Sequence, residues 1–401
     1  MEYGFILRWI VVYAGLWVLA LPLAAALFRR FPDSGSGLSV PLALTTLGFS
    51  GYWIGRVVFG LSTALVGVVI LSLLSGFALY KGVEVDWNRA TEPMAVFAVA
   101  FVFMLAIRAV DPGAFPGGGE KFLDLGLLSS LVRGRTLPPQ DMWFAGEPVN
   151  YYYGGHMIAA LLAELTATPP KYAYNLALPG FYAALVTAAY SVGGAVSAQF
   201  ERSHLVGGGF AAVFVGIASN LGTPLRALAW LLPGGRSVAE ILGFATGRYG
   251  NESLAYGPTG FSYWDASGGM VSGINEFPFF AFLNGDLHAH MMSTPFLLLT
   301  VGLLLSYWQT ATESRRRRRL LLFGSVPIVG GLLGVINTWS FPTVAGLTWL
   351  TLIFAPGHTA DLLPASLRNR LHGRERGHWV DRELDRSLVA FGVAVVVAAV
   401  G

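Results

Sequence analysis

Long apolar segments separated by charged turns constrain the fold of this chain more than any other feature of its sequence. The first of them, 5–28, is long enough to span a bilayer, because a helix needs ~20 residues to cross the hydrocarbon. Only 12% of the 401 residues are charged, whereas soluble domains have about 25%, and the mean hydropathy is +0.58. Backbone groups cannot stay unpaired in lipid and no alternating barrel pattern occurs, so we expect an all-α polytopic membrane bundle.

The apolar segments predict both the number of crossings and their positions. They fall at 5–28, 38–59, 61–80, 93–110, 156–168, 173–198, 205–220, 291–308, 320–337, 341–356 and 387–401. An even number of crossings is required between 156 and 290, so a further segment near 225–244 should cross or re-enter, which gives about 11–12 spans. The last segment stops while still hydrophobic, and we expect the polypeptide to continue beyond it.

Basic residues at the ends of the spans predict the orientation. By the positive-inside rule Arg29, Lys81 and the run Arg315–Arg319 should face the cytoplasm, which leaves segments 111–155 and 246–290 outside. We therefore expect a multi-pass plasma-membrane protein whose active face is outside. The arginine run is better explained by membrane orientation than by nucleic acid, so no nucleic-acid partner is expected.

The chain divides into three expected parts. These are N-terminal transmembrane helices at 1–92, a core with external loops at 93–343, and further helices at 344–401 that include a cytoplasmic linker at 358–386. Cysteine is absent, which excludes a disulfide framework, a thiolate metal site and a catalytic thiol.

The external segment 111–155 holds the first group of reactive side chains. Glu120 and Asp124 lie four residues apart on either side of Lys121, so on a helix the two carboxylates share one face. Either could act as a general base with the other as its partner. The alternative is a solvated helix start, in which the helix dipole favours Glu120.

The stretch EPVNYYYGGH places phenol and imidazole groups directly before an apolar segment. Tyrosine is enriched at membrane–water boundaries, which accounts for one or two of Tyr151, Tyr152 and Tyr153. Three in succession, with Asn150 before them and His156 after, indicate a site. The two intervening glycines allow close approach of a ligand or of another backbone.

The stretch INEFPFFAFLNGDLHAHMM carries a second group. Asp286, His288 and His290 alternate, so in an extended segment they project to one side, and a carboxylate with two imidazoles suits a divalent cation such as Mn²⁺ or Zn²⁺. Glu276 is a candidate partner just upstream. The alternative is that Asn284 or Asp286 caps the following helix.

A third, shorter motif is NTWSFPT. It contains Asn337 and Trp339 between two spans, on the same outer side as the other two groups. It also reads as a tight turn with an interfacial tryptophan.

Four stretches in order, GEKFLD, PVNYYYGGH, NEFPFFAFLNGDLHAH and NTWSFPT, resemble the tyrosine-triplet (YYY-type) family of prokaryotic membrane proteins, whose function is unknown. The resemblance covers about residues 93–343 of a chain shorter than most members. That family is distantly similar to the GT-C glycosyltransferases, which use an acidic pair in the first external loop. Here Glu120 stands at the acidic-pair position, but Lys121 replaces the second acid and Asp124 follows one turn later.

The resemblance implies an inverting sugar transfer from a polyprenyl-phosphate donor, with membrane lipids as surroundings and an unidentified acceptor. Glu120 or Asp124 would be the base, His156 a further catalytic group, and Asn150, Glu276, Asn337, Trp339 and the tyrosine triplet part of the substrate site. The cations expected to hold the lipid phosphate are Lys121, Arg133, Arg135 and Arg248. A divalent ion (Mn²⁺, Mg²⁺ or Zn²⁺) on Asp286, His288 and His290 would share that role.

Two other functions fit the same sequence. Charges within spans, Arg56 and Glu164, and the many glycines suit a transporter or lipid flippase, although transporters bind substrate near the midplane and these motifs gather in loops. A metal-dependent membrane hydrolase would use the same histidines to activate water.

Overall fold

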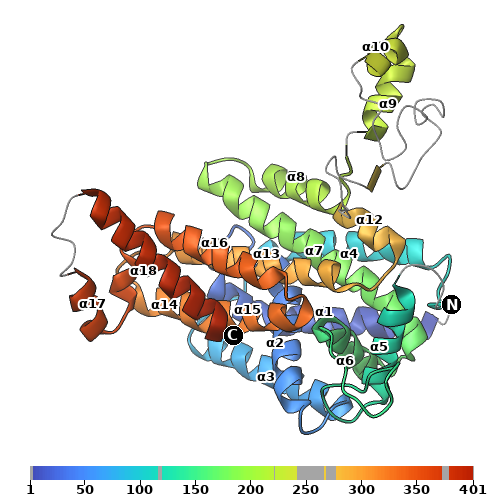
Figure 1. Ribbon diagram of the computed structural model, residues 1–401, viewed down its shortest axis with the longest axis horizontal. Coiled ribbons are helices and arrows are strands. Elements are labelled where there is room, and N and C mark those ends of the chain that lie inside the picture. The colour runs from blue at the N-terminus through green and yellow to red at the C-terminus, as the bar shows by residue number, and fades with distance from the viewer. Residues whose placement is uncertain are drawn as a thin grey trace.

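The computed structural model describes residues 3–115, 120–220, 222–241, 266–267, 277–372 and 379–400. Helices connected by turns make up these ranges, and no strand is formed within them. Figure 1 shows the helices packed lengthwise into an elongated bundle. The predicted all-α polytopic membrane fold is confirmed.

The helices have the following bounds. In chain order they are α1 (Tyr3–Leu27), η1 (Ser36–Leu38), α2 (Ser39–Ile54), α3 (Leu61–Tyr80), α4 (Trp87–Arg108), α5 (Lys121–Arg133), α6 (Gly154–Thr166), α7 (Pro170–Gln199), α8 (His204–Gly216), α9 (Gly222–Leu231), α10 (Gly235–Ile241), α12 (Pro278–Asn284), α13 (Ala289–Gln309), α14 (Arg315–Arg319), η3 (Leu320–Ser325), α15 (Val326–Ile336), α16 (Ser340–Phe354), η4 (Thr359–Leu362), α17 (Ala365–His372) and α18 (Trp379–Val400).

The described ranges contain fewer full-length spans than the 11–12 expected. Six helices are long and apolar enough to cross a membrane: α1, α3, α4, α7, α13 and the continuous helix Arg315–Ile336. Several expected spans are shorter, among them α6 with 13 residues and α16 with 15 residues. At 1.5 Å per residue such helices reach ~20 Å, well short of the ~30 Å hydrocarbon core.

The segment near 225–244, expected to cross or re-enter the membrane, does not form a crossing helix in its described part, 225–241, and re-entry stays a prediction. Two short helices occupy this stretch, α9 with 10 residues and α10 with 7 residues, and neither can cross a bilayer. Figure 1 shows both standing apart from the bundle. The apolar residues of 225–244 that suggested a span are interrupted by the turn around Pro233, where a helix cannot continue its hydrogen bonding.

Helix α7 forms the centre of the bundle. Within its 18-residue apolar window 94% of the residues are buried, because it packs against α4, α8 and α13 on different sides. Its many alanines and glycines let neighbouring helices approach closely, as is usual in membrane bundles. A bond from the Tyr182 hydroxyl to the Gly216 carbonyl, 3.0 Å long, ties it to α8.

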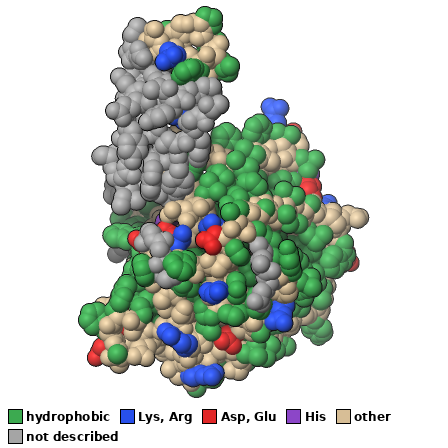
Figure 2. Space-filling view, turned by 90° about the vertical axis from the view of Figure 1, so that its right-hand side faces the viewer, with side chains coloured by type: hydrophobic (Ala, Val, Ile, Leu, Met, Phe, Trp, Pro, Cys, Tyr) green, Lys and Arg blue, Asp and Glu red, His purple; other side chains and the backbone are tan. Residues whose placement is uncertain are grey.

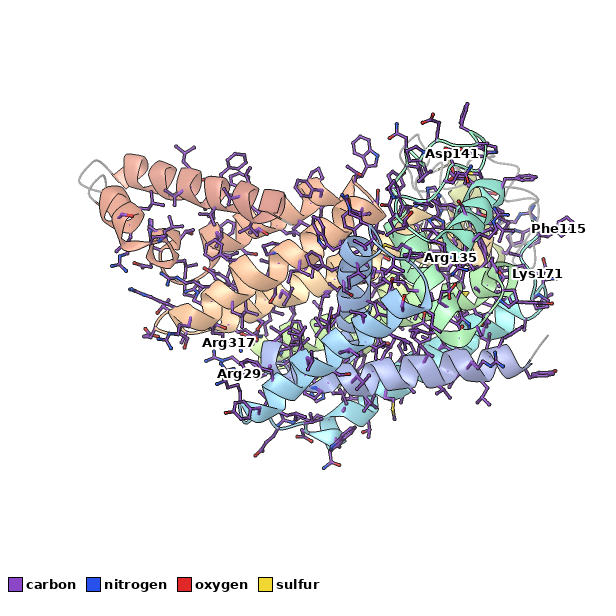
Figure 3. The ribbon with its side chains drawn as sticks, turned by 90° about the horizontal axis from the view of Figure 1, so that it is seen from below. Arg29, Phe115, Arg135, Asp141, Lys171 and Arg317 are labelled. Atoms are coloured by element: carbon purple, nitrogen blue, oxygen red, sulfur yellow. The ribbon has the colours of Figure 1, made fainter. Side chains whose placement is uncertain are left out.

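The bundle has two chemically different ends. We call the end that holds Glu120, Asp124, His156 and His288 the carboxylate end, and the end that holds Arg29, Lys81 and Arg315–Arg319 the arginine end. Helix α1 runs between them: Trp9 near its start bonds to Thr168, whereas the carbonyl of Leu27 at its finish accepts from Arg317. Figure 3 shows Arg29 and Arg317 together at one end and Arg135 and Lys171 at the other.

Candidate functional site

Helix α5 supplies the two carboxylates of the first motif. Glu120 occupies the N-cap position and Asp124 lies in the first turn. The apolar face of α5, which carries Leu127, Leu128 and Leu131, packs into the bundle. Asp124 lies on the same buried side of the helix and is 0% exposed. The Glu120 side chain is 55% exposed and makes no capping hydrogen bond. The solvated helix start therefore does not describe Asp124.

Helix α6 brings His156 to Asp124. Its first residue must be glycine, because a Cβ at Gly154 would lie 2.9 Å from the backbone nitrogen of Ile336 at the end of α15. This close approach of two backbones fixes where α6 begins. Nε2 of His156 then lies 3.2 Å from Oδ1 of Asp124, and both side chains are only 1% exposed.

The segment before α13 brings His288 to the same place. Nδ1 of His288 lies 2.6 Å from Oε2 of Glu120 and 4.0 Å from Oδ1 of Asp124. His288 is the N-cap residue of α13, in extended conformation, and no side chain caps that helix. Asp286 instead accepts a 2.6 Å hydrogen bond from the Asn284 amide, so the capping alternative is not what the structure contains.

Three helices thus begin at one cluster. Glu120 precedes α5, His156 lies in the first turn of α6, and His288 precedes α13. Helix N-termini carry partial positive charge and unpaired N–H groups, which favour anions. The carboxylate end therefore combines acidic side chains with a backbone field that attracts negative charge.

The buried members of the cluster lack hydrogen bonds. Both carboxylate oxygens of Asp124 and both ring nitrogens of His156 are buried without a hydrogen-bond partner in the described part of the chain, as is Nδ1 of His288. These groups lie close to one another without aligned hydrogen-bond geometry. Most buried polar atoms in proteins are hydrogen-bonded, so each exception requires an explanation, and a functional role is one of them.

Asp286 borders the cluster from α13's side. Burial raises the pKa of its carboxyl, Lys121 opposes that rise and Asp124 adds to it. Because the charge of Lys121 acts on this carboxyl, Lys121 lies near Asp286. His290 follows, with its ring 4.8 Å from that of His288.

The tyrosine triplet divides between two environments. The rings of Tyr151 and Tyr152 lie 4.0 Å apart, and burial, the Tyr152 hydroxyl and the negative charges of Glu120 and Asp124 raise the pKa of the Tyr151 phenol. Tyr153 is turned away, with its ring 6.5 Å from that of Tyr52, and burial raises its pKa to about 12. Tyr151 therefore belongs to the cluster as a neutral phenol.

Arg133 and Arg135 lie away from the cluster. Arg133 is at the far end of α5, ~18 Å along the helix from Lys121, and Arg135 follows it; both are exposed. Asn150 is exposed. Arg248 and Glu276 lie outside the described residues.

The third motif, NTWSFPT, directly follows α15, which packs against α6. Asn337 is buried, and its amide donates a 3.2 Å hydrogen bond to Ser340. Trp339 is 81% exposed, as expected of an interfacial tryptophan. The motif is therefore joined to the cluster through the contact of Ile336 with Gly154.

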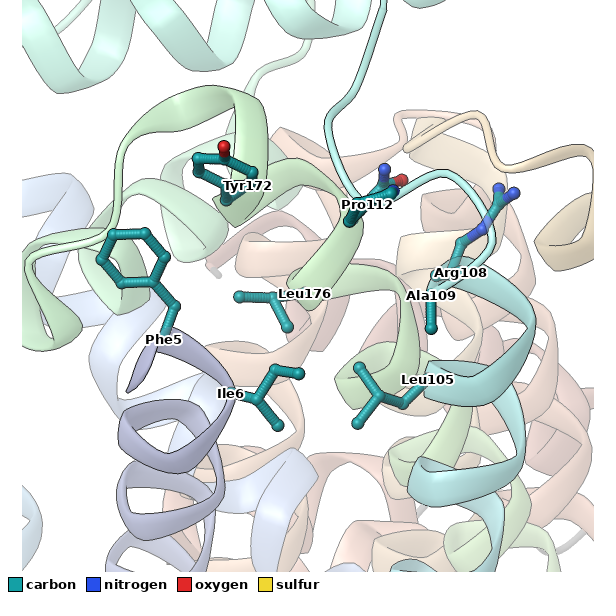
Figure 4. A pocket seen from close by; sticks show the side chains of 9 residues that line it. Phe5, Ile6, Leu105, Arg108, Ala109, Pro112, Tyr172 and Leu176 are labelled. Carbon is teal, nitrogen blue, oxygen red and sulfur yellow. The ribbon is translucent and has the colours of Figure 1, made fainter. Parts of the chain in front are cut away.

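Two residues that sequence reasoning missed border the cluster. The Tyr174 hydroxyl accepts a 2.7 Å hydrogen bond from the backbone N–H of Leu287 and lies near Asp124, Asp286 and Arg108. Arg108 is the last residue of α4. A charge at the end of a predicted span is the sequence feature that could have identified it. Figure 4 shows its guanidinium turned away from the apolar pocket lined by Leu105 and Leu176.

The guanidinium of Arg108 fills the space beside Gly285. A Cβ at Gly285 would collide with it, and Gly285 also has a φ of +74°, so glycine is required there for both reasons. Figure 2 views the carboxylate end face on, and acidic and basic side chains appear on it among hydrophobic ones.

The metal set remains a prediction. Among the residues that the structure describes, no group of three or more His, Asp or Glu side chains is arranged to hold a metal ion. His288 faces Glu120, and one oxygen of Asp286 is occupied by the Asn284 amide, so these two do not turn toward a common point. The sugar transfer that we propose does not depend on a metal.

The comparisons with known proteins identify a family and nothing more specific. Residues 46–401 match one family model, described as an uncharacterized membrane protein (DUF2298). No curated protein and no solved structure matches the chain. None of these comparisons supports the expected similarity to GT-C enzymes.

Proposed function

This chain belongs to the DUF2298 family of uncharacterized membrane proteins, the tyrosine-triplet family, and we propose that it transfers a sugar from a polyprenyl-phosphate carrier to an acceptor hydroxyl. The observation that carries the proposal is the cluster in which exposed Glu120 lies 2.6 Å from His288 while buried Asp124 stands behind them. The proposal includes a site on the outer face of the plasma membrane, since the arginines gather at the opposite end of the bundle.

Exposure favours Glu120 over Asp124 as the base. A general base must come within hydrogen-bond reach of the proton that it removes. The Glu120 side chain is 55% exposed, whereas that of Asp124 is 1% exposed and enclosed by the apolar face of α5. An acceptor can therefore approach Glu120 and cannot approach Asp124.

His288 and Asp124 act on Glu120 from behind. Nδ1 of His288 is close enough to hold the Glu120 carboxylate in one orientation and to share the proton that it takes. Asp124 brings a second carboxylate to within 4.0 Å of the same nitrogen. His156 in turn contacts Asp124, so these are positioning residues.

The donor phosphate fits the positive features of the same end. The N-termini of α5, α6 and α13 begin at the cluster, and Lys121 and Arg108 lie beside it. Cations and helix N-termini stabilise a departing phosphate, which is where negative charge develops. Lys121 and Arg108 are the cations that the geometry favours over Arg133 and Arg135.

The proposed transfer needs no reactant besides the donor, the acceptor and the side chains of this protein. The acceptor oxygen bonds to the anomeric carbon as the bond from that carbon to the phosphate oxygen breaks, with inversion. The acceptor proton passes to Glu120, and the electron pair leaves with polyprenyl phosphate. The rings of Tyr151 and Tyr152, tilted by 35° to one another, offer an apolar face to the sugar, and the neutral Tyr151 hydroxyl can donate to it.

The test is sugar transfer by the purified full chain in lipid nanodiscs. Radiolabelled polyprenyl-phosphate sugars are supplied with membrane-extract acceptors, and Glu120→Gln is compared with Glu147→Gln, an exposed glutamate of the same loop. We expect Glu120→Gln to lower the transfer rate about 10²- to 10⁴-fold. Glu147→Gln should stay within about twofold, and both should melt like the wild type because both side chains are exposed.

Three results would contradict the proposal. Full transfer by Glu120→Gln would remove the base. Release of free sugar by the wild type without any acceptor would indicate a hydrolase. Uptake of labelled donor into sealed vesicles without a covalent product would indicate a transporter.

A further inference from the structure

The arginine end contains a large cavity that the proposed sugar transfer does not use. Its volume is about 820 Å³, within the size range of small-molecule sites. Its walls come from α1, α2, α3 and α13 and from the helix that continues through η3 into α15. Leu74, Phe77 and Ile328 are among its apolar lining residues, and each faces the part of the bundle that lipid chains would reach.

The rim of the cavity is positively charged. Arg29, Lys81 and Arg317 line it together with one acid, Glu84, so the four charges sum to two positive. Figure 3 shows Arg29 and Arg317 close together at this end. Apolar walls below a cationic rim match a molecule that has a hydrocarbon part and an anionic head.

The three cations are held in different ways. Arg317 is fixed, because its guanidinium donates 2.7 Å hydrogen bonds to the carbonyls of Ala26 and Leu27. The Lys81 ammonium lies 5.3 Å from the ring of Phe77. Arg29 is exposed and forms no side-chain hydrogen bond or ion pair with the described residues. One cation is therefore preorganised, and the other two can adjust to a ligand.

A helical irregularity lies directly in the cavity wall. Residues Leu320–Ser325 form a π-helix, and Leu320, Gly324 and Ser325 all line the cavity. π-helical turns are rare and are found mostly at functional sites, since the wider turn is less favourable than α-helix. This is a second observation, independent of charge, that the cavity is built for a ligand.

We propose that this cavity binds an anionic phospholipid, with its phosphate between Arg29, Lys81 and Arg317 and an acyl chain along Leu74, Phe77 and Ile328. The proposal concerns the end of the bundle opposite the carboxylate cluster and does not rest on the sugar-transfer proposal. A zwitterionic lipid would bring a positive choline group to a rim that is already positive, so it should bind more weakly.

Native mass spectrometry of the full chain, released from detergent with added lipid, tests this site. Dioleoylphosphatidylglycerol and dioleoylphosphatidylcholine are titrated separately against the wild type and against Arg29→Gln/Lys81→Gln. We expect the wild type to bind phosphatidylglycerol more tightly than phosphatidylcholine. The double variant should bind phosphatidylglycerol about 30-fold more weakly, at about fivefold per cation near a phosphate surface.

Matched variants separate the cavity from general charge. Arg315→Gln/Arg316→Gln removes the same charge at the same end from exposed residues outside the cavity lining, and it should retain wild-type affinity. Leu74→Trp fills the apolar part without changing charge and should weaken both lipids equally.

Other results overturn the proposal. Equal binding of the two lipids by the wild type, or equal losses in the two double variants, would show that the cavity does not select the headgroup. Unchanged binding by Leu74→Trp would show that no chain enters. Displacement of phosphatidylglycerol by millimolar inorganic phosphate would show a site for a free oxyanion instead of a lipid.

Discussion

The two ends of the bundle differ in whether their charged side chains form hydrogen bonds. At the arginine end Arg317, Arg318 and Arg319 all donate hydrogen bonds to backbone carbonyls. At the carboxylate end Asp124 and His156 are at least as deeply buried, yet none of their side-chain polar atoms has a hydrogen bond among the described residues. Each arginine has at least one hydrogen bond to the fold, although Nε of Arg318 is buried without one, whereas the acid and the imidazole have none.

The carbonyls that the arginines reach explain this difference. Ala26 and Leu27 end α1, and Leu362 ends η4, so the guanidinium groups pair the unbonded carbonyls at helix C-termini. Cations there also match the helix dipole. The arginine run therefore stabilises the fold as well as favouring an orientation, whereas nothing in folding requires an unbonded aspartate beside an unbonded histidine.

The largest effect should come from removing a hydrogen-bonded arginine. Arg318 is 4% exposed, donates a 2.7 Å hydrogen bond to the Pro356 carbonyl and lies 4.2 Å from the centre of the Tyr307 ring. Arg318→Ala removes this hydrogen bond and leaves a void beside the ring, so it should lower the free energy of unfolding by about 2–4 kcal/mol. Thermal unfolding in detergent measures this.

The neighbouring arginine is the control. Arg316→Ala alters an exposed side chain of the same run and should change stability by less than about 0.5 kcal/mol. Equal losses in the two variants would mean that the run acts through total charge and not through bonds to carbonyls.

A smaller effect, of opposite sign, is expected at the carboxylate end. Asp124→Asn keeps the shape of the side chain and removes a buried negative charge that has no hydrogen bond. Because the substitution breaks no hydrogen bond of the Asp124 carboxylate, we expect stability to be unchanged or to rise by about 1 kcal/mol. Sugar transfer should fall, because the orientation of His288 changes.

The outcome that contradicts this comparison is a large loss of stability. If Asp124→Asn unfolded as readily as Arg318→Ala, the Asp124–His156 contact would be a structural ion pair. His156→Gln offers a second measurement, because it removes the imidazole that contacts Asp124 and places an amide at a similar position.

Composition and apolar segment length were sufficient to predict the fold class. Among the described residues they overestimated the number of full-length spans, because apolarity marks any helix that is buried, whether by lipid or by protein. Helix α6 is the example: its 13 residues are mostly buried inside the bundle and too few to cross ~30 Å. The sequence does not distinguish these two kinds of burial.

The members of the site were predictable from their motifs, and their roles were not. The motifs containing Glu120, His156 and His288 were identified by clustered reactive side chains, and the structure brings these three residues together. The choice between Glu120 and Asp124 depended on which side of α5 turns into the bundle. Arg108 and Tyr174 were missed because each lies near the end of an apolar span, outside the four motifs in which reactive side chains cluster.

The smallest effect concerns pH, and it should have opposite signs at the two ends. Burial raises the pKa of Asp286, so the folded state keeps this proton to a higher pH than the unfolded chain, whose ordinary value is 3.8. Its contribution to stability is therefore present at low pH and lost as pH rises through the raised pKa, by at most about 1.4 kcal/mol per pH unit. Asp286→Asn should remove that slope.

Glu313 at the arginine end provides the opposite case. Hydrogen bonds from its own backbone N–H and from the Thr312 hydroxyl lower the pKa of its carboxyl. Its contribution is present at neutral pH and is lost as pH falls through the lowered pKa. Unfolding midpoints measured from about pH 3 to 7 should thus change in opposite directions for Asp286→Asn and Glu313→Gln, relative to the wild type. Shifts of the same sign would mean that the carboxyl groups at the two ends are held alike, and the comparison between the ends would fail.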